Sequence, residues 1–346
     1  MGTHVPDRIV TNDDLSLTLD TSDEWISTRS GIRERRIAAD DQAASDLGAV
    51  AAARALEAAG VRPSELDLII TASLSPDMLF PATASFISGK IGADGVPAFD
   101  LSAACTGFIY ALATGSAFIA SGQAEKVLVV GADVVSKMID WTDRSTAVLF
   151  GDGAGAVLLE PAESEQEGIL GFDLGNDPSG AGLLSLAAGG SRLPASRETV
   201  ESGGHFISMN GREVYKFAAR IIVSSARKLL GETGYGVDEV DLFVPHQANI
   251  RIIDAAAGKL GIPPERVFTN LERYGNTSCA SIPLCIDEAV LTGRLGATAG
   301  VQGKNPDGSG RSESGSNKLV LMVGFGGGLS WGSCLARTGD IKRIQE

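Results

Sequence analysis

The chain has 346 residues, 44% of them hydrophobic, which is enough for two domains or for one large two-lobed domain with a proper core. Its formal net charge of −14 argues against general nucleic-acid binding. The sequence has no run of about 18 apolar residues, so no membrane span is predicted. The first residues show no secretory signal. The four cysteines lack CxxC spacing, so we expect a reduced, cytoplasmic protein.

The first half of the chain alternates helices and strands. A helix is predicted over 46–59, a short buried strand over 96–102 and a long apolar helix over 109–120. Cys105 stands where that strand meets the apolar helix. A thiol on the first turn of a helix feels the positive end of the helix dipole, which favours the thiolate. Cys105 is therefore a candidate nucleophile, although a lone free cysteine is more often a small buried hydrophobic residue.

The second half repeats the pattern of the first. The paired segments are the helices 46–59 and 213–230, the strands 66–70 and 240–244, and the strands 126–131 and 318–324. A repeat of this length predicts two similar α/β lobes, with apolar helices sandwiched between their sheets. We expect halves of residues 1–165 and 166–346, with an active site where they meet.

Two polar segments of the second half are candidates to join the thiol. His246, one of three histidines, follows the strand 240–244, and ligands bind at strand ends in α/β proteins. Asn276 lies in a turn-rich loop that opens another helix. An imidazole can polarise a thiol or a carbonyl, and an amide can donate a second hydrogen bond. Taken alone, His246 could equally well be a structural histidine, and Asn276 could equally well be a turn former. Cys279, Cys285 and Cys334 are interpreted as core residues.

The motifs around these residues resemble those of β-ketoacyl-acyl-carrier-protein synthase III, the thiolase-fold condensing enzyme that starts fatty-acid synthesis. The matching segments are TSDEWI (21–26), TRSGIRER (28–35), AACTGF (103–108), FGDGAGA (150–156), VPHQAN (244–249), GNTS (275–278) and FGGG (325–328). The resemblance runs almost end to end. It implies an α/β protein with two duplicated halves in an α-β-α-β-α layered arrangement. No metal or redox cofactor is expected, with acyl-CoA as a substrate.

The resemblance also implies a reaction. Cys105 would take an acyl group from acyl-CoA, and malonyl-acyl-carrier protein would then be decarboxylated and attack the acyl thioester. His246 and Asn276 would hydrogen-bond the malonyl thioester carbonyl as enolate charge develops there. The backbone N–H groups of Cys105 and Gly327 would form the oxyanion hole for the acyl carbonyl.

By the same resemblance, further residues receive expected roles. Contacts to CoA and its pantetheine arm are expected from Trp25, Arg29, Arg144, Gly211, Tyr215 (commonly Phe in the family) and Asn249. Lys216, Arg251 and Lys259 are candidates for docking the acidic carrier protein, although any of them could be merely solvated. The family forms homodimers, and Phe80 matches the loop residue that crosses into the partner's pocket, which Phe325 also lines.

Two segments depart from the family pattern. Residues 296–317 are rich in Gly, Ser and charge, which is typical of a flexible surface insertion. The family's first strand would precede Met1, so we expect the first sheet to lack it.

Three alternative functions compete with this interpretation. A ketosynthase or acyltransferase that primes a polyketide or other secondary-metabolite pathway would carry the same three residues, so it stays open. A biosynthetic thiolase would have a second cysteine in the segment where this chain has Phe325 to Gly328. A non-catalytic subunit would lack Cys105. The preferred acyl chain depends on pocket packing that the sequence does not reveal.

Overall fold

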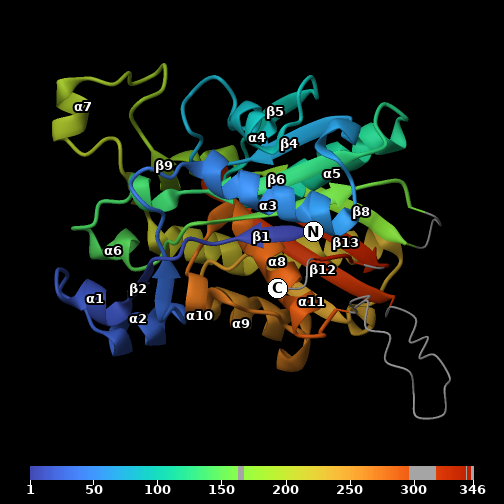
Figure 1. Cartoon of the computed structure of the whole chain (residues 1–346). Helices are drawn as coiled ribbons and strands as arrows, with labels where there is room; N and C mark the ends of the chain where they lie inside the picture. Colours follow the sequence, from blue (N-terminus) through green and yellow to red (C-terminus); the bar gives the residue numbers. More distant parts are fainter. Residues whose placement is uncertain (163–166, 296–316, 340, 344–346) are drawn as a thin grey trace, which may run out of the picture.

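The computed structural model describes residues 1–162, 167–295, 317–339 and 341–343 (Figure 1). Nearly all of the predicted insertion at 296–317 therefore lies outside the described residues, and so does the expected boundary between the halves at residue 165.

The first sheet is built from strands of the first half of the chain. Its order is β1 (Gly2–His4), β7 (Gly153–Leu159), β6 (Val127–Asp133), β4 (Leu68–Ala72) and β5 (Ala98–Leu101). β4, β5 and β6 are parallel, whereas β7 and β1 each run antiparallel to their neighbour. β4 and β6 are buried along their whole length, in keeping with sequences that are apolar except for Thr71 and Asp133.

The second sheet repeats this arrangement with one strand fewer. Its order is β11 (Leu242–Pro245), β12 (Lys318–Gly326), β13 (Ser330–Thr338) and β8 (Gly168–Asn176). β11 is parallel to β12, and the remaining pairs are antiparallel. At the position that β5 occupies in the first sheet, β11 has only an isolated parallel bridge, between Phe243 and Val267.

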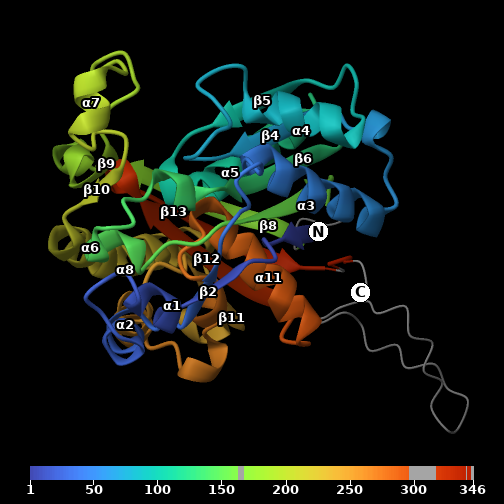
Figure 2. The same cartoon turned by 60° about the vertical axis from the view of Figure 1, so that its left-hand side comes forward.

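Helices form three layers around the two sheets (Figures 1 and 2). α5 (Gly107–Ala120) and α11 (Ser281–Leu291) lie between the sheets and contribute to one apolar core with strands of both. α3 (Ala44–Ala59) and α4 (Thr83–Ile91) cover the first sheet from outside, and α8 (Gly211–Thr233) and α9 (Ile250–Leu260) cover the second. The predicted α-β-α-β-α layering of a thiolase-like fold is confirmed.

Shorter elements surround the ends of the strands. Two small antiparallel sheets pair β2 (Ile9–Thr11) with β3 (Glu34–Arg36), and β9 (Leu184–Leu186) with β10 (Ile207–Met209). The short helices are α1 (Asn12–Ser16), α2 (Asp23–Ser30), α6 (Arg144–Ala147), α7 (Arg197–Glu201) and α10 (Leu271–Tyr274). Among the described helices, none combines the length and apolar character needed to cross a membrane.

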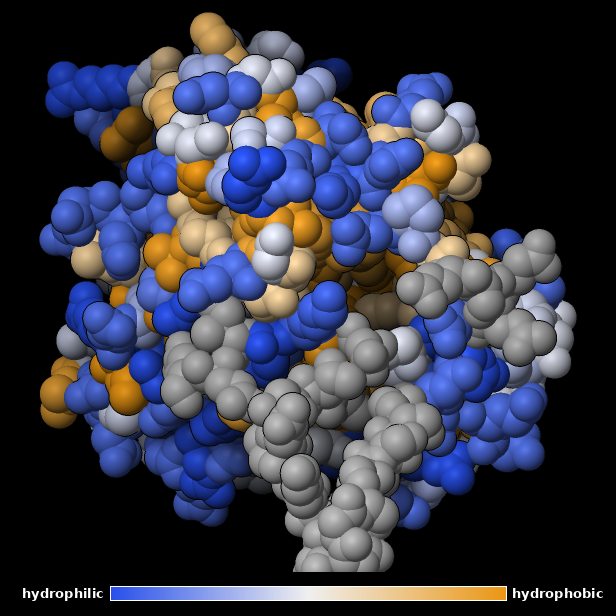
Figure 3. All heavy atoms as spheres, turned by 45° about the vertical axis from the view of Figure 1, so that its right-hand side comes forward, coloured by the Kyte–Doolittle hydropathy of each residue, from blue (hydrophilic) through white to orange (hydrophobic). Residues whose placement is uncertain are grey.

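Two expectations about the strands need correction. β5 is half-buried, not buried, because it forms the edge of its sheet. The first strand is not missing: β1 takes its place, but it pairs only with Ala154 to Ala156 while β7 continues to Leu159. A mostly apolar cavity of about 310 Å³ adjoins the part of β7 that pairs with β6 but has no β1 partner. Figure 3 shows hydrophobic side chains lining a hollow on this side of the molecule.

Candidate active site

Cys105 lies between the end of β5 and the start of α5. It belongs to a single 3-10 turn, η2 (Ala104–Thr106), and not to the first turn of α5 itself. Ala104 adopts a left-handed conformation, with φ of +47°. This conformation is uncommon for a residue with a Cβ. It turns the chain sharply at the residue before the thiol.

The Cys105 thiol is neutral in the resting protein. Burial raises its pKa to about 12, and the charge of Asp133 acts in the same direction. The prediction that the start of a helix would favour a thiolate is therefore wrong for this state. A helix dipole contributes only a modest favourable term, and the loss of hydration in a closed interior outweighs it. To act as a nucleophile, the Cys105 thiol therefore has to lose its proton during the reaction, with the help of groups in the site.

His246 follows β11 and is also a neutral group. Its backbone N–H donates to Val323 O at 2.8 Å, which fixes the residue against β12. Burial lowers its pKa to about 3. Its Nδ1 lies 2.7 Å from Ser281 Oγ at the start of α11. When the Ser281 hydroxyl donates to Nδ1, the ring proton stands on Nε2, so the imidazole acts as an uncharged N–H donor.

Asn276 is held by the segment before β7. Its N–H donates to Leu149 O at 2.8 Å, and its carbonyl accepts from Gly151 N–H at 3.0 Å. The Ser278 N–H donates to Asn276 Oδ1 at 2.9 Å. Because Oδ1 is occupied in this way, the amide Nδ2 is left as the donor that the side chain presents to the site.

The three candidate catalytic residues share one cavity of about 220 Å³. Its other lining residues are Leu149, Phe150, Leu184, Met209, Gly211, Val214, Tyr215, Ala248, Asn249, Ile252, Phe325 and Gly326. Phe325 is buried, and its ring meets the His246 ring edge-on at 5.3 Å between centroids. The cavity draws its walls from both halves of the chain, as expected. A larger open depression of about 870 Å³, beside Arg8 and Trp141, includes none of the three residues.

A second cavity of about 190 Å³ lies on another side of the thiol, and the sequence did not reveal it. Apart from Cys105 and Ser185, its walls carry no polar side chain. The lining residues are Leu74, Ala104, Cys105, Met138, Phe150, Leu184, Ser185, Leu186, Ile207 and Gly327. Two of its walls come from the paired strands β9 and β10, which are too short to give a clear periodic signal in the sequence.

The glycine run after β12 approaches the thiol closely. A Cβ added at Gly326 would lie 2.7 Å from Cys105 N, so only glycine allows the two backbones to meet here. Gly327, the predicted oxyanion residue, lines the apolar cavity together with Cys105. Leu329, at the end of the turn that follows, also has a left-handed φ, of +46°.

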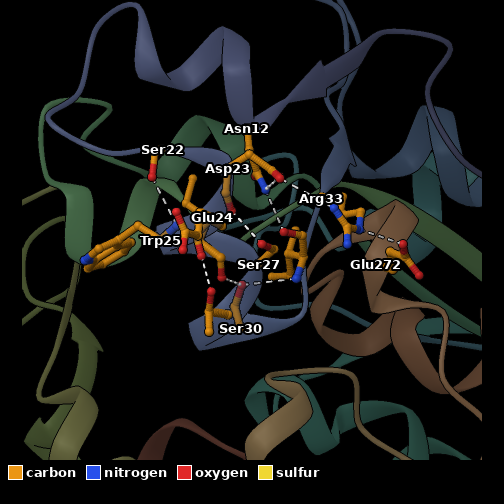
Figure 4. Close-up of polar contacts among 12 residues, drawn as sticks. Asn12, Ser22, Asp23, Glu24, Trp25, Ser27, Ser30, Arg33 and Glu272 are labelled. Carbon is orange, nitrogen blue, oxygen red and sulfur yellow. Dashed lines mark hydrogen bonds and ion pairs between the residues drawn. The ribbon is translucent and has the colours of Figure 1, made fainter.

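Trp25, Arg29 and Arg144, which are predicted to contact CoA at the entrance of the active site, lie close together. The Arg29 guanidinium lies 4.4 Å from the centre of the Trp25 ring, and that of Arg144 lies 4.7 Å from it. Trp25 projects from α2, whose first turn is capped by Ser22 Oγ at 3.1 Å from the Trp25 N–H (Figure 4).

Polar contacts on another side of α2 fix its position (Figure 4). Asn12 Nδ2 donates to Asp23 Oδ1 at 2.8 Å and to Ile32 O at 2.7 Å. Arg33 pairs with Asp23 at 3.4 Å and with Glu272 at 2.9 Å, which joins the two halves of the chain on the side of α2 away from Trp25.

The remaining predicted residues lie on or near α8 and α9. Asn249 caps α9 and donates through Nδ2 to Arg29 O at 3.0 Å, which links the cavity wall to the entrance. Arg251 Nε donates to Thr28 O at 3.1 Å. Lys216 is exposed and pairs with Glu213, whereas Lys259 reaches Ala219 O at 3.5 Å. Phe80 is not part of this site: it stands on a surface loop and is 83% exposed.

Comparisons with known proteins identify the family. The model of 3-oxoacyl-[acyl-carrier-protein] synthase III matches residues 99–178, and the model of its C-terminal region matches residues 230–301. A protein of Natranaerobius thermophilus named β-ketoacyl-[acyl-carrier-protein] synthase III is 49% identical over 338 residues, which cover 97% of each chain. This chain belongs to the β-ketoacyl-acyl-carrier-protein synthase III family. It is an acyltransferase of the condensing-enzyme type, as the motifs predicted.

Solved structures of two related enzymes share the fold over 98% of this chain. The enzyme of Thermus thermophilus is 44% identical, with a TM-score of 0.86 over 98% of both chains. The priming β-ketosynthase of the R1128 polyketide biosynthetic pathway is 36% identical, also with a TM-score of 0.86, over 98% of this chain and 95% of its own.

Proposed function

We propose that this synthase condenses an acyl-CoA starter with malonyl-acyl-carrier protein, with decarboxylation, to give 3-ketoacyl-acyl-carrier protein in the initiation of fatty-acid synthesis. The observation that carries the proposal is the shared cavity. A buried thiol, a neutral imidazole and an amide donor line one space of about 220 Å³. These are the groups needed for acyl transfer to sulfur followed by stabilisation of an enolate.

The first step transfers the acyl group. The Cys105 sulfur attacks the acyl-CoA carbonyl, a carbon–sulfur bond forms to Cys105, and the bond to the CoA sulfur breaks. The thiol proton ends on the departing CoA. The N–H groups of Cys105 and Gly327 hold the oxyanion of the tetrahedral intermediate. The acyl chain then occupies the apolar cavity beside Leu186 and Ile207.

The second step forms the new carbon–carbon bond. Decarboxylation of the malonyl group places negative charge on its thioester oxygen, where His246 Nε2 and Asn276 Nδ2 donate. Neutral donors suit this task because the charge is present only in and after the transition state. After CO₂ has departed, the enolate carbon attacks the acyl–Cys105 carbonyl, and the carbon–sulfur bond to Cys105 breaks. The sulfur leaves as a thiolate and takes up a proton from water, which restores the neutral thiol.

The entrance and the surface supply binding. Trp25, Arg29 and Arg144 contact the CoA nucleotide, and Gly211, Tyr215 and Asn249 line the path of the pantetheine arm. Lys216, Arg251 and Lys259 meet the acidic carrier protein next to that path. The active form is a homodimer in which Phe80 of each subunit reaches the pocket of the other.

Mass spectrometry tests the intermediate. Incubation with acetyl-CoA should add one acyl mass to the peptide that contains Cys105, and Cys105→Ser should lose both the adduct and condensation. Cys279, also buried and near the site, is the built-in control. An adduct on Cys279 in place of Cys105 would refute the assignment.

A second function has one specific observation in its favour. The priming β-ketosynthase of the R1128 polyketide pathway has the same TM-score as the Thermus thermophilus enzyme. We therefore propose, as the alternative, that the chain primes a polyketide or another secondary-metabolite pathway. The test measures kcat/KM for condensation with a purified fatty-acid carrier protein and with a purified polyketide carrier protein, each loaded with malonate. The carrier protein that gives the higher kcat/KM identifies the pathway.

A further inference from the structure

Ser278 is a buried polar residue for which the reaction described above has no use. It opens a 3-10 turn, η7 (Ser278–Ala280), two residues after Asn276. Its φ of +51° is left-handed, and its side chain is fully buried. Its Oγ has no hydrogen-bond partner among the described residues. Burying a hydroxyl without a partner costs free energy, so this group calls for an explanation.

The turn that carries Ser278 packs against the turn that carries Cys105. The Sγ of Cys279 lies 3.0 Å from the carbonyl oxygen of Ala104, the residue before the nucleophile. The Cys279 thiol thus has its own acceptor in η2. Burial raises the pKa of both thiols, Cys105 and Cys279, and the Ser278 hydroxyl, which lies between the two turns, lowers the pKa of each.

The side chain and the backbone of Ser278 serve different neighbours. Its N–H donates to Asn276 Oδ1 at 2.9 Å, which orients the amide for the malonyl substrate. Its hydroxyl is not needed for that contact. A substitution that removes only the hydroxyl therefore separates the two roles.

We propose that Ser278 is a further catalytic residue, whose hydroxyl donates a hydrogen bond to the Cys105 sulfur whenever that sulfur carries negative charge. The inference rests on the proposed acyl-Cys105 mechanism and deepens it. Charge is on the sulfur twice: when it attacks the acyl-CoA carbonyl, and when it leaves as the carbon–carbon bond forms. No proton is transferred to or from Ser278 in either step.

The role has a physical reason in the closed environment of the thiol. A neutral sulfur gains little from a hydroxyl donor, whereas a buried thiolate without a donor is strongly disfavoured. The unpaired hydroxyl of the resting state thus becomes paired in the transition state. An interaction made only then accelerates the reaction.

The test compares Ser278→Ala and Ser278→Gly with the parent protein. Both variants remove the hydroxyl and keep the N–H, and glycine also relieves the left-handed backbone. Thr71→Val is the matched control, because Thr71 is fully buried, its Oγ1 also lacks a partner, and it lies within β4. Alkylation of Cys105 by iodoacetamide, located by peptide mass, reports thiolate formation between about pH 7 and 9.5. Acylation by acetyl-CoA and decarboxylation of malonyl-acyl-carrier protein are measured separately.

We expect both Ser278 variants to alkylate and acylate Cys105 roughly tenfold or more slowly at each pH, as loss of a hydrogen bond to a charged group predicts. The decarboxylation rates of both Ser278 variants, and all rates of the Thr71→Val control, should stay close to those of the parent protein. Parental alkylation and acylation rates in both variants would overturn the proposal. An equal loss of acylation and decarboxylation would also overturn it, because it would assign Ser278 to the positioning of Asn276. A parent that never acylates Cys105 would instead refute the proposed function itself.

Discussion

At the scale of single residues, His246 shows how burial selects a chemical role. Its pKa of about 3 means that the imidazole stays uncharged throughout the physiological range. A charged imidazolium would be the stronger donor, but it would carry its charge in the ground state as well as in the transition state. The neutral ring donates without that cost.

The pH dependence of this residue is a testable consequence. Malonyl decarboxylation should show no inflection near pH 6.5, the ordinary pKa of histidine. Between about pH 6.5 and pH 3 the unfolded chain takes up a proton at this position and the folded one does not, so stability falls as the pH falls. The slope should approach about 1.4 kcal/mol per pH unit.

Chemical denaturation at several pH values, compared with His246→Gln, isolates this contribution. The difference in unfolding free energy between parent and variant should change across that window. A difference that is independent of pH would contradict the assignment of a neutral, buried imidazole.

Asn276 offers a sharper substitution than alanine. Asn276→Asp keeps the shape and the acceptor for the Ser278 N–H but removes the Nδ2 donor. Loss of a donor to a developing oxyanion costs about a hundredfold in rate. Decarboxylation of malonyl-acyl-carrier protein should fall by at least that factor, while acetyl-CoA still acylates Cys105. Failure to acylate with normal decarboxylation would reverse the roles assigned to the two halves of the reaction.

The sequence predicted the three central residues because each stands in a recognisable segment next to a strand or a helix start. It did not predict Ser281, Ser278 or the neutral state of Cys105. Serines are common, and nothing in their spacing says which ones face a thiol or an imidazole. The pKa of Cys105 depends on how completely both halves close over it, which is a property of packing.

At the scale of elements, the meeting of β12 with η2 is the most demanding contact. Gly326→Ala would place a methyl group 2.7 Å from Cys105 N. Overpacking of this kind typically costs about 1–3 kcal/mol, and it would also shift the oxyanion donor. We expect a lower melting temperature and a marked loss of Cys105 acylation, measured by calorimetry and by mass spectrometry.

Gly231→Ala within α8 is the matched control for that substitution. No atom lies within 4 Å of the added methyl group, and alanine is preferred to glycine within a helix by about 0.5–1 kcal/mol. This variant should be slightly more stable and fully active. Equal tolerance at both glycines would show that the backbones at Gly326 have room to separate.

Long elements with strong apolar patterns were predictable and short ones were not. The helices at 44–59 and 107–120 begin within two residues of their predicted starts and end at the predicted residues. The β9–β10 pair could not be predicted because strands such as Leu184–Leu186 are too short to show alternation. Edge position is likewise invisible in a sequence, so β5 was expected to be buried.

At the scale of the whole molecule, two features of the first half favour association with a second copy. β5 is an edge strand with half-buried residues. Beside the start of α4, a loop carries Leu79 and Phe80, which are 80% and 83% exposed. Exposed apolar side chains next to an open strand edge are typical of an interface.

We therefore expect a dimer at micromolar concentration by light scattering. Phe80→Ser should weaken the dimer and lower condensation, because Phe80 is proposed to complete the partner's pocket. Leu17→Ser is the control, since Leu17 is also 83% exposed but stands after α1. A fully active monomer, or equal effects of both substitutions, would refute the assembly.

Three residues other than glycine adopt left-handed backbone conformations among the described residues: Ala104, Ser278 and Leu329. Each lies at a junction that meets the nucleophile. Such conformations cost about 1–3 kcal/mol each, so the protein gives up stability where it does chemistry. A library selected for heat resistance alone should enrich glycine at these three positions. The selected variants would be more stable but would turn over more slowly. Selection for stability and selection for activity therefore favour different residues at these junctions.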